Sequence, residues 1–150
     1  MLKGIDPRLN AEVLFALRAM GHGDTLAIVD TNFPADSVAQ HTALGDLLHM
    51  DNLTAGEVLE AVLSVMPLDT LIDDFAGRME VVGNPEEIPP VQQEAQAAID
   101  EAEGRPSPMF GIERFAFYDR ARECYAVIRT GERRFYGNFI LSKGVVAPED

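Results

Sequence analysis

A five-residue run, Thr25 to Val29, constrains the fold of this chain more than any other segment. Its last four residues are all apolar, as in a strand that is buried on both faces of a parallel sheet covered by helices. The turn Gly21-His22-Gly23-Asp24 precedes the run, and Asp30 follows it. The sequence therefore predicts an α/β fold with a histidine before the amino end of a central strand and a carboxylate at its carboxyl end.

Helix and strand patterns alternate along the rest of the chain. Asp6 is expected to cap a first helix with Pro7 at its first position, and this helix should end at Gly21. Thr54-Ala55-Gly56-Glu57 matches a capping box, and the helix that it begins is expected to reach Pro67. Two further helices are expected, a solvent-facing one from Pro90 to Ala102 and a second from Glu113 to Arg122. Three further strands are expected at Met79 to Val82, Tyr125 to Ile128 and Phe135 to Leu141.

The length and the apolar content fit one core. The chain has 150 residues, of which 47% are hydrophobic, and it contains no interdomain linker that we recognise. Alternating helices and strands favour layers of helices on both faces of a sheet. We therefore expect residues 1–150 to form a single-domain three-layer α/β sandwich with a mainly parallel sheet.

Charge and composition exclude several classes of function. The 12 basic and 25 acidic residues give a net charge of -13, which repels nucleic acids. No apolar run is long enough to span a bilayer, and a single cysteine, Cys124, allows no intrachain disulfide, so we expect a soluble cytoplasmic protein. His41 and His49 lack the spacing of metal ligands, and there is no P-loop or dinucleotide-binding fingerprint. We expect no metal and no cofactor.

His22 and Asp30 are the first candidate site residues. A histidine between two glycines lies on open backbone, and imidazole can donate or accept a proton near neutral pH, although a solvated turn histidine without a role fits the same pattern. Asp30 lies where ligands bind in open α/β sheets, at the carboxyl end of a strand, although a turn residue before Phe33-Pro34 is the alternative. Because a strand rises ~3.3 Å per residue, the two need not meet within one subunit. A site shared between subunits would bring them together.

Two later segments supply further candidates. Arg114 follows a Pro-rich loop and is suited to holding sugar hydroxyls, or alternatively it is the solvent-facing residue of an amphipathic helix. In Tyr136-Gly137-Asn138 a glycine lies inside the expected last strand, which is typical of a bulge or of a close approach of ligand to backbone. Tyr136 and Asn138 flank it with a hydroxyl and an amide.

Several separated blocks of the sequence, in this order, resemble the fucose mutarotase and ribose pyranase family, and the resemblance is closer to the fucose side. The blocks extend over nearly the whole chain: Met1-Leu2-Lys3-Gly4-Ile5, Met20-Gly21-His22-Gly23-Asp24, Asp30 with Phe33-Pro34, Arg114-Phe115-Ala116-Phe117-Tyr118, and Thr130-Gly131-Glu132 leading to Tyr136-Gly137-Asn138. The segment from Glu86 to Gly104 departs from the family pattern, so the resemblance leaves the oligomeric state and the preferred sugar open.

The resemblance implies a function and a set of roles. His22 would be the proton donor, while Asp30, Arg114, Tyr136 and Asn138 would bind the sugar with the Gly137 backbone close to it. The protein would be an isomerase of carbohydrate metabolism that interconverts the α and β anomers of a monosaccharide, with L-fucose as the first candidate. It would form a homo-oligomeric ring, often a decamer in this family, with sites near subunit contacts.

The hypothesis of mutarotation requires one proton to leave the anomeric hydroxyl and one to reach the ring oxygen. His22 would exchange a proton with one of these oxygens, Asp30 would orient His22 or a sugar hydroxyl, and Tyr136 or Asn138 would relay the second proton. Two enzymatic or binding alternatives remain, a D-ribose pyranase and a non-catalytic module that binds a monosaccharide. A scaffold that binds no sugar is the third alternative.

Overall fold

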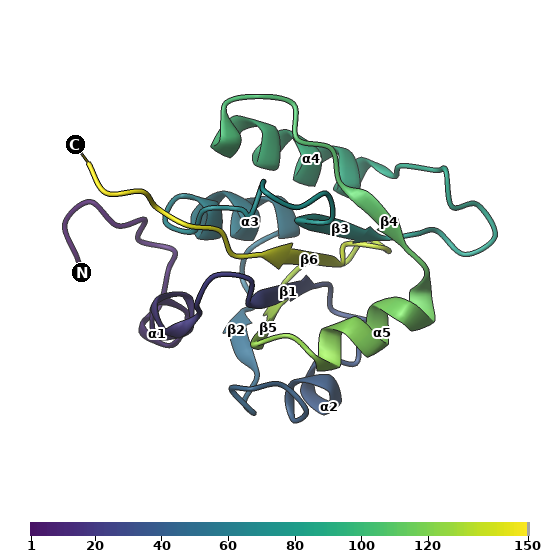
Figure 1. Ribbon diagram of the computed structural model, residues 1–150. Helices are drawn as coiled ribbons and strands as arrows, with labels where there is room; N and C mark the ends of the chain where they lie inside the picture. Colours follow the sequence, from purple (N-terminus) through teal and green to yellow (C-terminus); the bar gives the residue numbers. More distant parts are fainter. Residues whose placement is uncertain (150) are drawn as a thin grey trace.

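One six-stranded sheet forms the centre of the computed structural model (Figure 1), which describes residues 1–149. The strands lie in the order β2-β5-β1-β6-β3-β4. β1 is parallel to β5, β5 to β2, and β3 to β4, whereas β6 runs antiparallel to both β1 and β3. The predicted mainly parallel sheet is confirmed, with β6 as the exception. The strand bounds are β1 Thr25–Val29, β2 Leu48–Met50, β3 Ala76–Met79, β4 Phe110–Ile112, β5 Ala126–Thr130 and β6 Phe139–Ser142.

Helices cover both faces of the sheet and make the three predicted layers. α1 (Ala11–Ala19), α3 (Ala55–Leu63) and α4 (Pro90–Glu103) pack on one face, and α2 (Ala35–Ala39) and α5 (Arg114–Arg122) pack on the other. Successive side chains of β1 alternate between the two cores, with Leu26 and Ile28 in the first and Ala27 and Val29 in the second. This is why the run Thr25 to Val29 needs no polar face.

Most of the predicted elements are present, and the corrections concern their ends. Thr54 makes the predicted capping box with Glu57, but α3 ends at Leu63 rather than at Pro67. Asn10 caps α1, because its side chain accepts the Val13 N–H, whereas Asp6 is bound to Arg8. The prediction that Asp6 is the N-cap was therefore wrong.

Two strand predictions were displaced along the chain. The structure gives Ala76–Met79 in place of Met79 to Val82, and β6 begins at Phe139 rather than at Phe135. Tyr136, Gly137 and Asn138 therefore form a loop before β6 instead of a stretch inside it. The expected helix from Pro90 corresponds to α4, which exposes one side and buries Val91, Gln92, Ala95 and Ile99 on the other.

Candidate functional site

Polar residues gather at both ends of β1, and the strand separates them. The turn with His22 precedes β1, and Asp30 follows it. The five residues of β1 alone extend about 16 Å at the usual rise per residue. His22 and Asp30 of one chain therefore belong to two separate centres.

The carboxyl end of β1 opens into a pocket of about 200 Å³. This volume is below the ~300–1,000 Å³ that is usual for drug-sized ligands, so the pocket suits a small molecule such as one sugar ring. Its lining combines hydroxyl, amide, carboxylate and guanidinium groups with apolar walls. The residues are Asp30, Asn32, Phe33, Met79, Val82, Arg114, Tyr118, Phe135, Tyr136 and Asn138.

Asp30 and Asn138 form the buried floor of this pocket. The Asp30 backbone N–H donates to Asn138 Oδ1 at 2.9 Å, and Asn138 Nδ2 donates to Asp30 Oδ2 at 3.1 Å. Asp30 Oδ1 accepts the backbone N–H groups of Asn32 and Phe33. Only 3% of Asp30 and 4% of Asn138 is exposed, so both side chains are fixed before any ligand binds.

Burial raises the pKa of the Asp30 carboxyl above its ordinary value. Hydrogen bonds from the backbones of Asn32, Phe33 and Gly137 and from the Asn138 side chain act in the opposite direction but do not cancel the effect of burial. A carboxylate in such surroundings gains from polar hydroxyl groups that replace lost water.

Arg114 and Tyr118 form the outer wall of the pocket, one turn apart on α5. Arg114 Nε donates to Tyr118 Oη at 3.0 Å, and its guanidinium lies 5.5 Å from the centre of the Tyr118 ring. The Glu113 side chain caps α5 by accepting the N–H groups of Phe115 and Ala116. The cap thus fixes the first turn of the helix, from which Arg114 extends into the pocket lining.

Gly137 lies behind the pocket rather than on its surface. A Cβ at this position would lie 2.9 Å from Glu132 Cγ and 3.3 Å from Val91 Cγ2, so a larger residue would push into these neighbours, whereas Asp30 Cβ at 3.5 Å would be an ordinary contact. Glu132 is itself 4% exposed and is held by Arg134. Burial acts to raise the pKa of the Glu132 carboxyl, but the hydrogen bonds and charge of Arg134, together with a hydrogen bond from the Ala55 backbone, lower it below its ordinary value. The glycine is needed for close packing beneath Asp30.

His22 and Asp69 form the centre at the amino end of β1. His22 Nε2 lies 3.1 Å from Asp69 Oδ2; the imidazole side chain is 50% exposed and the carboxylate 5%. Asp69 Oδ1 is buried without a hydrogen-bond partner among the described residues. A proton on Nε2 is thus directed at Asp69, which leaves Nδ1 free at the surface.

The chain segment after β6 holds these two residues together. The backbone of Lys143 makes two hydrogen bonds to the turn: its carbonyl accepts the Gly23 N–H, and its N–H donates to Asp24 O. The carbonyl of Ser142 accepts the Asp69 N–H. A Cβ at Gly144 would lie 2.4 Å from Leu68 O, so only glycine allows this approach of the two backbones. The turn with His22 and the loop with Asp69 are therefore attached to one rigid strand end.

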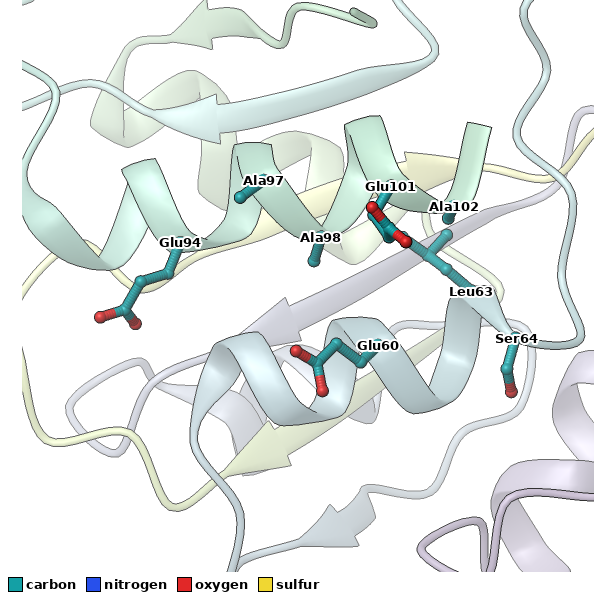
Figure 2. Close-up of a pocket in the computed structure, with 8 residues that line it drawn as sticks. All are labelled: Glu60, Leu63, Ser64, Glu94, Ala97, Ala98, Glu101 and Ala102. Atoms are coloured by element: carbon teal, nitrogen blue, oxygen red, sulfur yellow. The ribbon is translucent and has the colours of Figure 1, made fainter. Parts of the chain in front are cut away.

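A larger hollow of about 720 Å³ lies between α3 and α4. Figure 2 shows Glu60 on α3, and Glu94 and Glu101 on α4, along the space between the two helices. Leu63, Ser64 and three alanines complete its lining. This mixture of carboxylates and small apolar groups lacks the amides and aromatic rings that the smaller pocket offers to a sugar.

The remaining candidate groups are isolated. Within residues 1–149 no three His, Cys, Asp or Glu side chains gather in a way that would hold a metal ion. Burial raises the pKa of the Cys124 thiol to about 11. His49 is exposed and pairs with Asp51. Over the same residues, no helix has the length and hydropathy that a membrane span requires.

Residues 3–146 match the model of the RbsD / FucU transport protein family. The chain belongs to this family. The fucose mutarotase of Homo sapiens is 42% identical, over 97% of this chain and 95% of that protein. The crystal structure of protein Atu2016 is 61% identical, with a TM-score of 0.96, over 98% of this chain and 97% of the other. The fucose mutarotase of Streptococcus pneumoniae, solved in complex with L-fucose, is 33% identical, with a TM-score of 0.87, over 97% of this chain and all of the other.

The RbsD/FucU fold brings together most of the site residues that the sequence suggests. Asp30, Arg114, Tyr136 and Asn138 all line one pocket, whereas His22 lies at the other end of β1 beside Asp69. Asp30 therefore does not orient His22 of the same chain. Sequence reasoning missed Tyr118 as a site residue, although its place four residues after Arg114 puts both on one helix face. It also missed Asp69 and Met79, for which no local pattern gives a signal.

Proposed function

We propose that this protein is a mutarotase that interconverts the α and β anomers of a free monosaccharide, with L-fucose as its preferred substrate. The observation that carries the proposal is the small pocket around the buried Asp30–Asn138 pair, in a chain whose full-length relatives are named fucose mutarotases. A D-ribose pyranase would use the same proton transfers and is the second candidate within the family.

The pocket provides the groups that a sugar needs. Asp30 accepts hydrogen bonds from hydroxyl groups, Arg114 donates them, and the Tyr136 hydroxyl and the Asn138 amide do both. Phe33 and Met79 give the apolar surface on which the carbon skeleton of a sugar packs. Because the polar groups are fixed by the protein, little ordering is left to occur on binding.

The chemistry is proton transfer without an electron sink, so no cofactor is required. The base removes the proton from the anomeric hydroxyl while an acid protonates the ring oxygen, and the C–O bond of the ring breaks. The free aldehyde rotates, and the reverse transfers close the ring on the other face. His22 is the group that donates and recovers one of these protons, through Nδ1, while Asp69 holds Nε2 and orients the ring. Tyr136 handles the second proton in this proposal.

We further propose that the active site is shared by two copies of the chain. His22 and the pocket face opposite ends of β1, so the His22 of one subunit meets the pocket of its neighbour. Head-to-tail contacts close into a ring when the rotation between neighbours permits it, and we propose a homo-oligomeric ring with a decamer as the first candidate. We infer a cytoplasmic location from the single cysteine, Cys124, which is consistent with a reducing compartment.

The test is the exchange rate between the α and β anomeric protons of the sugar, measured by NMR magnetisation transfer with L-fucose, D-ribose and D-galactose in parallel. Faster exchange for L-fucose than for the other two is expected. Faster interconversion of the ring sizes of D-ribose, without an effect on L-fucose, would favour the pyranase. Binding of L-fucose without faster anomer exchange would contradict the mutarotase proposal and would favour the non-catalytic module that binds a monosaccharide.

A further inference from the structure

Tyr136 has an unusual backbone. With a φ of 65°, it is the one residue other than glycine in the left-handed region among residues 1–149. For a side chain this large the region is sparsely populated, and such a conformation persists only where the surroundings enforce it. Something outside the pocket therefore holds Tyr136 in place.

Gln92 supplies the contact. It lies on α4 and has no exposed surface. Its Nε2 donates two hydrogen bonds, to Met79 O at 2.7 Å and to Tyr136 O at 3.1 Å. Its Oε1 accepts Arg78 Nη1 at 3.3 Å, and Arg78 Nη2 donates in turn to Pro85 O. One amide thus uses both of its N–H groups on carbonyls that no strand pairing satisfies.

The two carbonyls belong to two walls of the pocket. Met79 ends β3 and Tyr136 lies in the loop before β6, and both side chains line the pocket, whereas Gln92 does not. Tyr136 Oη also accepts the Val82 N–H at 3.1 Å, so hydrogen bonds hold both the backbone carbonyl and the hydroxyl of this residue. Loss of the Gln92 contact would release Tyr136 from its strained conformation and move its hydroxyl.

We propose that Gln92 is a positioning residue of the sugar site, acting through the Tyr136 and Met79 carbonyls from the far side of the pocket wall. The proposal rests on the proposed function for its kinetic consequence, but its structural consequence can be measured without it.

The chain offers a matched control on the same helix. Gln96 also makes three hydrogen bonds through its amide, donating to Asp100 Oδ1 and Ser107 O and accepting the Met109 N–H. None of its partners lines the pocket. Gln92→Met and Gln96→Met therefore remove the same number of hydrogen bonds from α4, and only the first touches the site. Gln92→Glu is the second test variant, because it keeps the shape and the Arg78 contact but has no N–H for the carbonyls.

We expect both Gln92 variants to lower kcat/KM for L-fucose by about tenfold or more, through a higher KM and a lower kcat, because Tyr136 both binds the sugar and handles a proton. Gln96→Met should keep the wild-type KM. An unchanged KM in both Gln92 variants, or an equal rise in Gln96→Met, would overturn the proposal.

A crystal structure of Gln92→Glu separates this inference from the proposed function. Tyr136 should leave the positive-φ region or lose the Val82 hydrogen bond, even if the wild-type protein turns over no sugar. An unmoved Tyr136 would overturn the positioning role whatever the activity of the protein.

Discussion

The two ends of β1 are built in opposite ways. At the amino end, a half-exposed His22 on a glycine-flanked turn has one buried partner, Asp69. At the carboxyl end, a buried Asp30 accepts hydrogen bonds from Asn138, Asn32 and Phe33 at the floor of a pocket. An exposed imidazole can exchange protons with a molecule that it meets, whereas a buried carboxylate with several hydrogen bonds is suited to orienting one. In the proposed function the His22 end therefore supplies the first proton, and the pocket end recognises the sugar and handles the second proton through Tyr136.

The largest effect is expected from a substitution of His22, at the amino end of β1. His22→Ala should lower the rate of L-fucose anomer exchange by roughly 10²–10⁴-fold, the usual contribution of a general acid or base. Because His22 lies on an exposed turn, the melting temperature should stay close to that of the wild type. NMR exchange rates and a thermal melt check both statements.

His49→Ala is the matched control for this variant, since His49 also pairs with a carboxylate, Asp51, at 3.0 Å but lies outside both centres. Its exchange rate should equal that of the wild type. Equal rates for His22→Ala and His49→Ala would remove His22 from catalysis.

A smaller effect is expected from the partner of His22. Asp69→Asn removes the carboxylate that orients the imidazole through Nε2, so kcat should fall by about 10–100-fold while KM stays near the wild-type value. Asp51→Asn, the corresponding change beside His49, should leave both constants unaltered. A rise in KM with an unchanged kcat would instead place Asp69 in sugar binding.

The smallest effect is expected from Asp30, at the carboxyl end of β1, and concerns the stability of the protein. Since burial raises the pKa of Asp30, the folded protein binds a proton there more readily than the unfolded chain. As the pH rises above the ordinary pKa of an aspartate, ionisation of Asp30 therefore lowers the free energy of unfolding. Asp30→Asn cannot ionise. The free energy of unfolding of Asp30→Asn, relative to that of the wild type, should therefore increase from pH 4 to pH 7 in urea titrations. A difference that is constant or falls with pH would contradict the raised pKa.

The sequence predicted much of the scaffold because local signals were strong. Thr54 and Glu57 are three residues apart and make their capping box without outside help, and the apolar run from Thr25 needs only burial. The predicted start of the first helix was wrong because Asp6 and Asn10 are both suitable N-cap residues. In the structure Asp6 forms a salt bridge with Arg8, and Asn10 caps the helix.

The sites were harder to predict because they depend on contacts between distant residues. Asp69 is 47 residues from His22, and Asp30 is 108 residues from Asn138. For Asn138 the neighbouring glycine gave a hint, although the loop conformation that brings its side chain to Asp30 was not predicted. Nothing around Asp69 marks it, since its role depends on the way Ser142 and Lys143 hold two loops together.

The most direct test of the account asks whether the two ends of β1 act across subunits. His22→Ala and Asn138→Ala, each inactive alone, are co-expressed with different tags, and the mixed oligomers are isolated and assayed for L-fucose anomer exchange. If neighbours share each site, random assembly leaves both centres intact at about one quarter of the contacts, and about one quarter of the wild-type activity should return. Mixed oligomers that stay as inactive as the two parents would contradict a site built from the His22 of one subunit and the pocket of another.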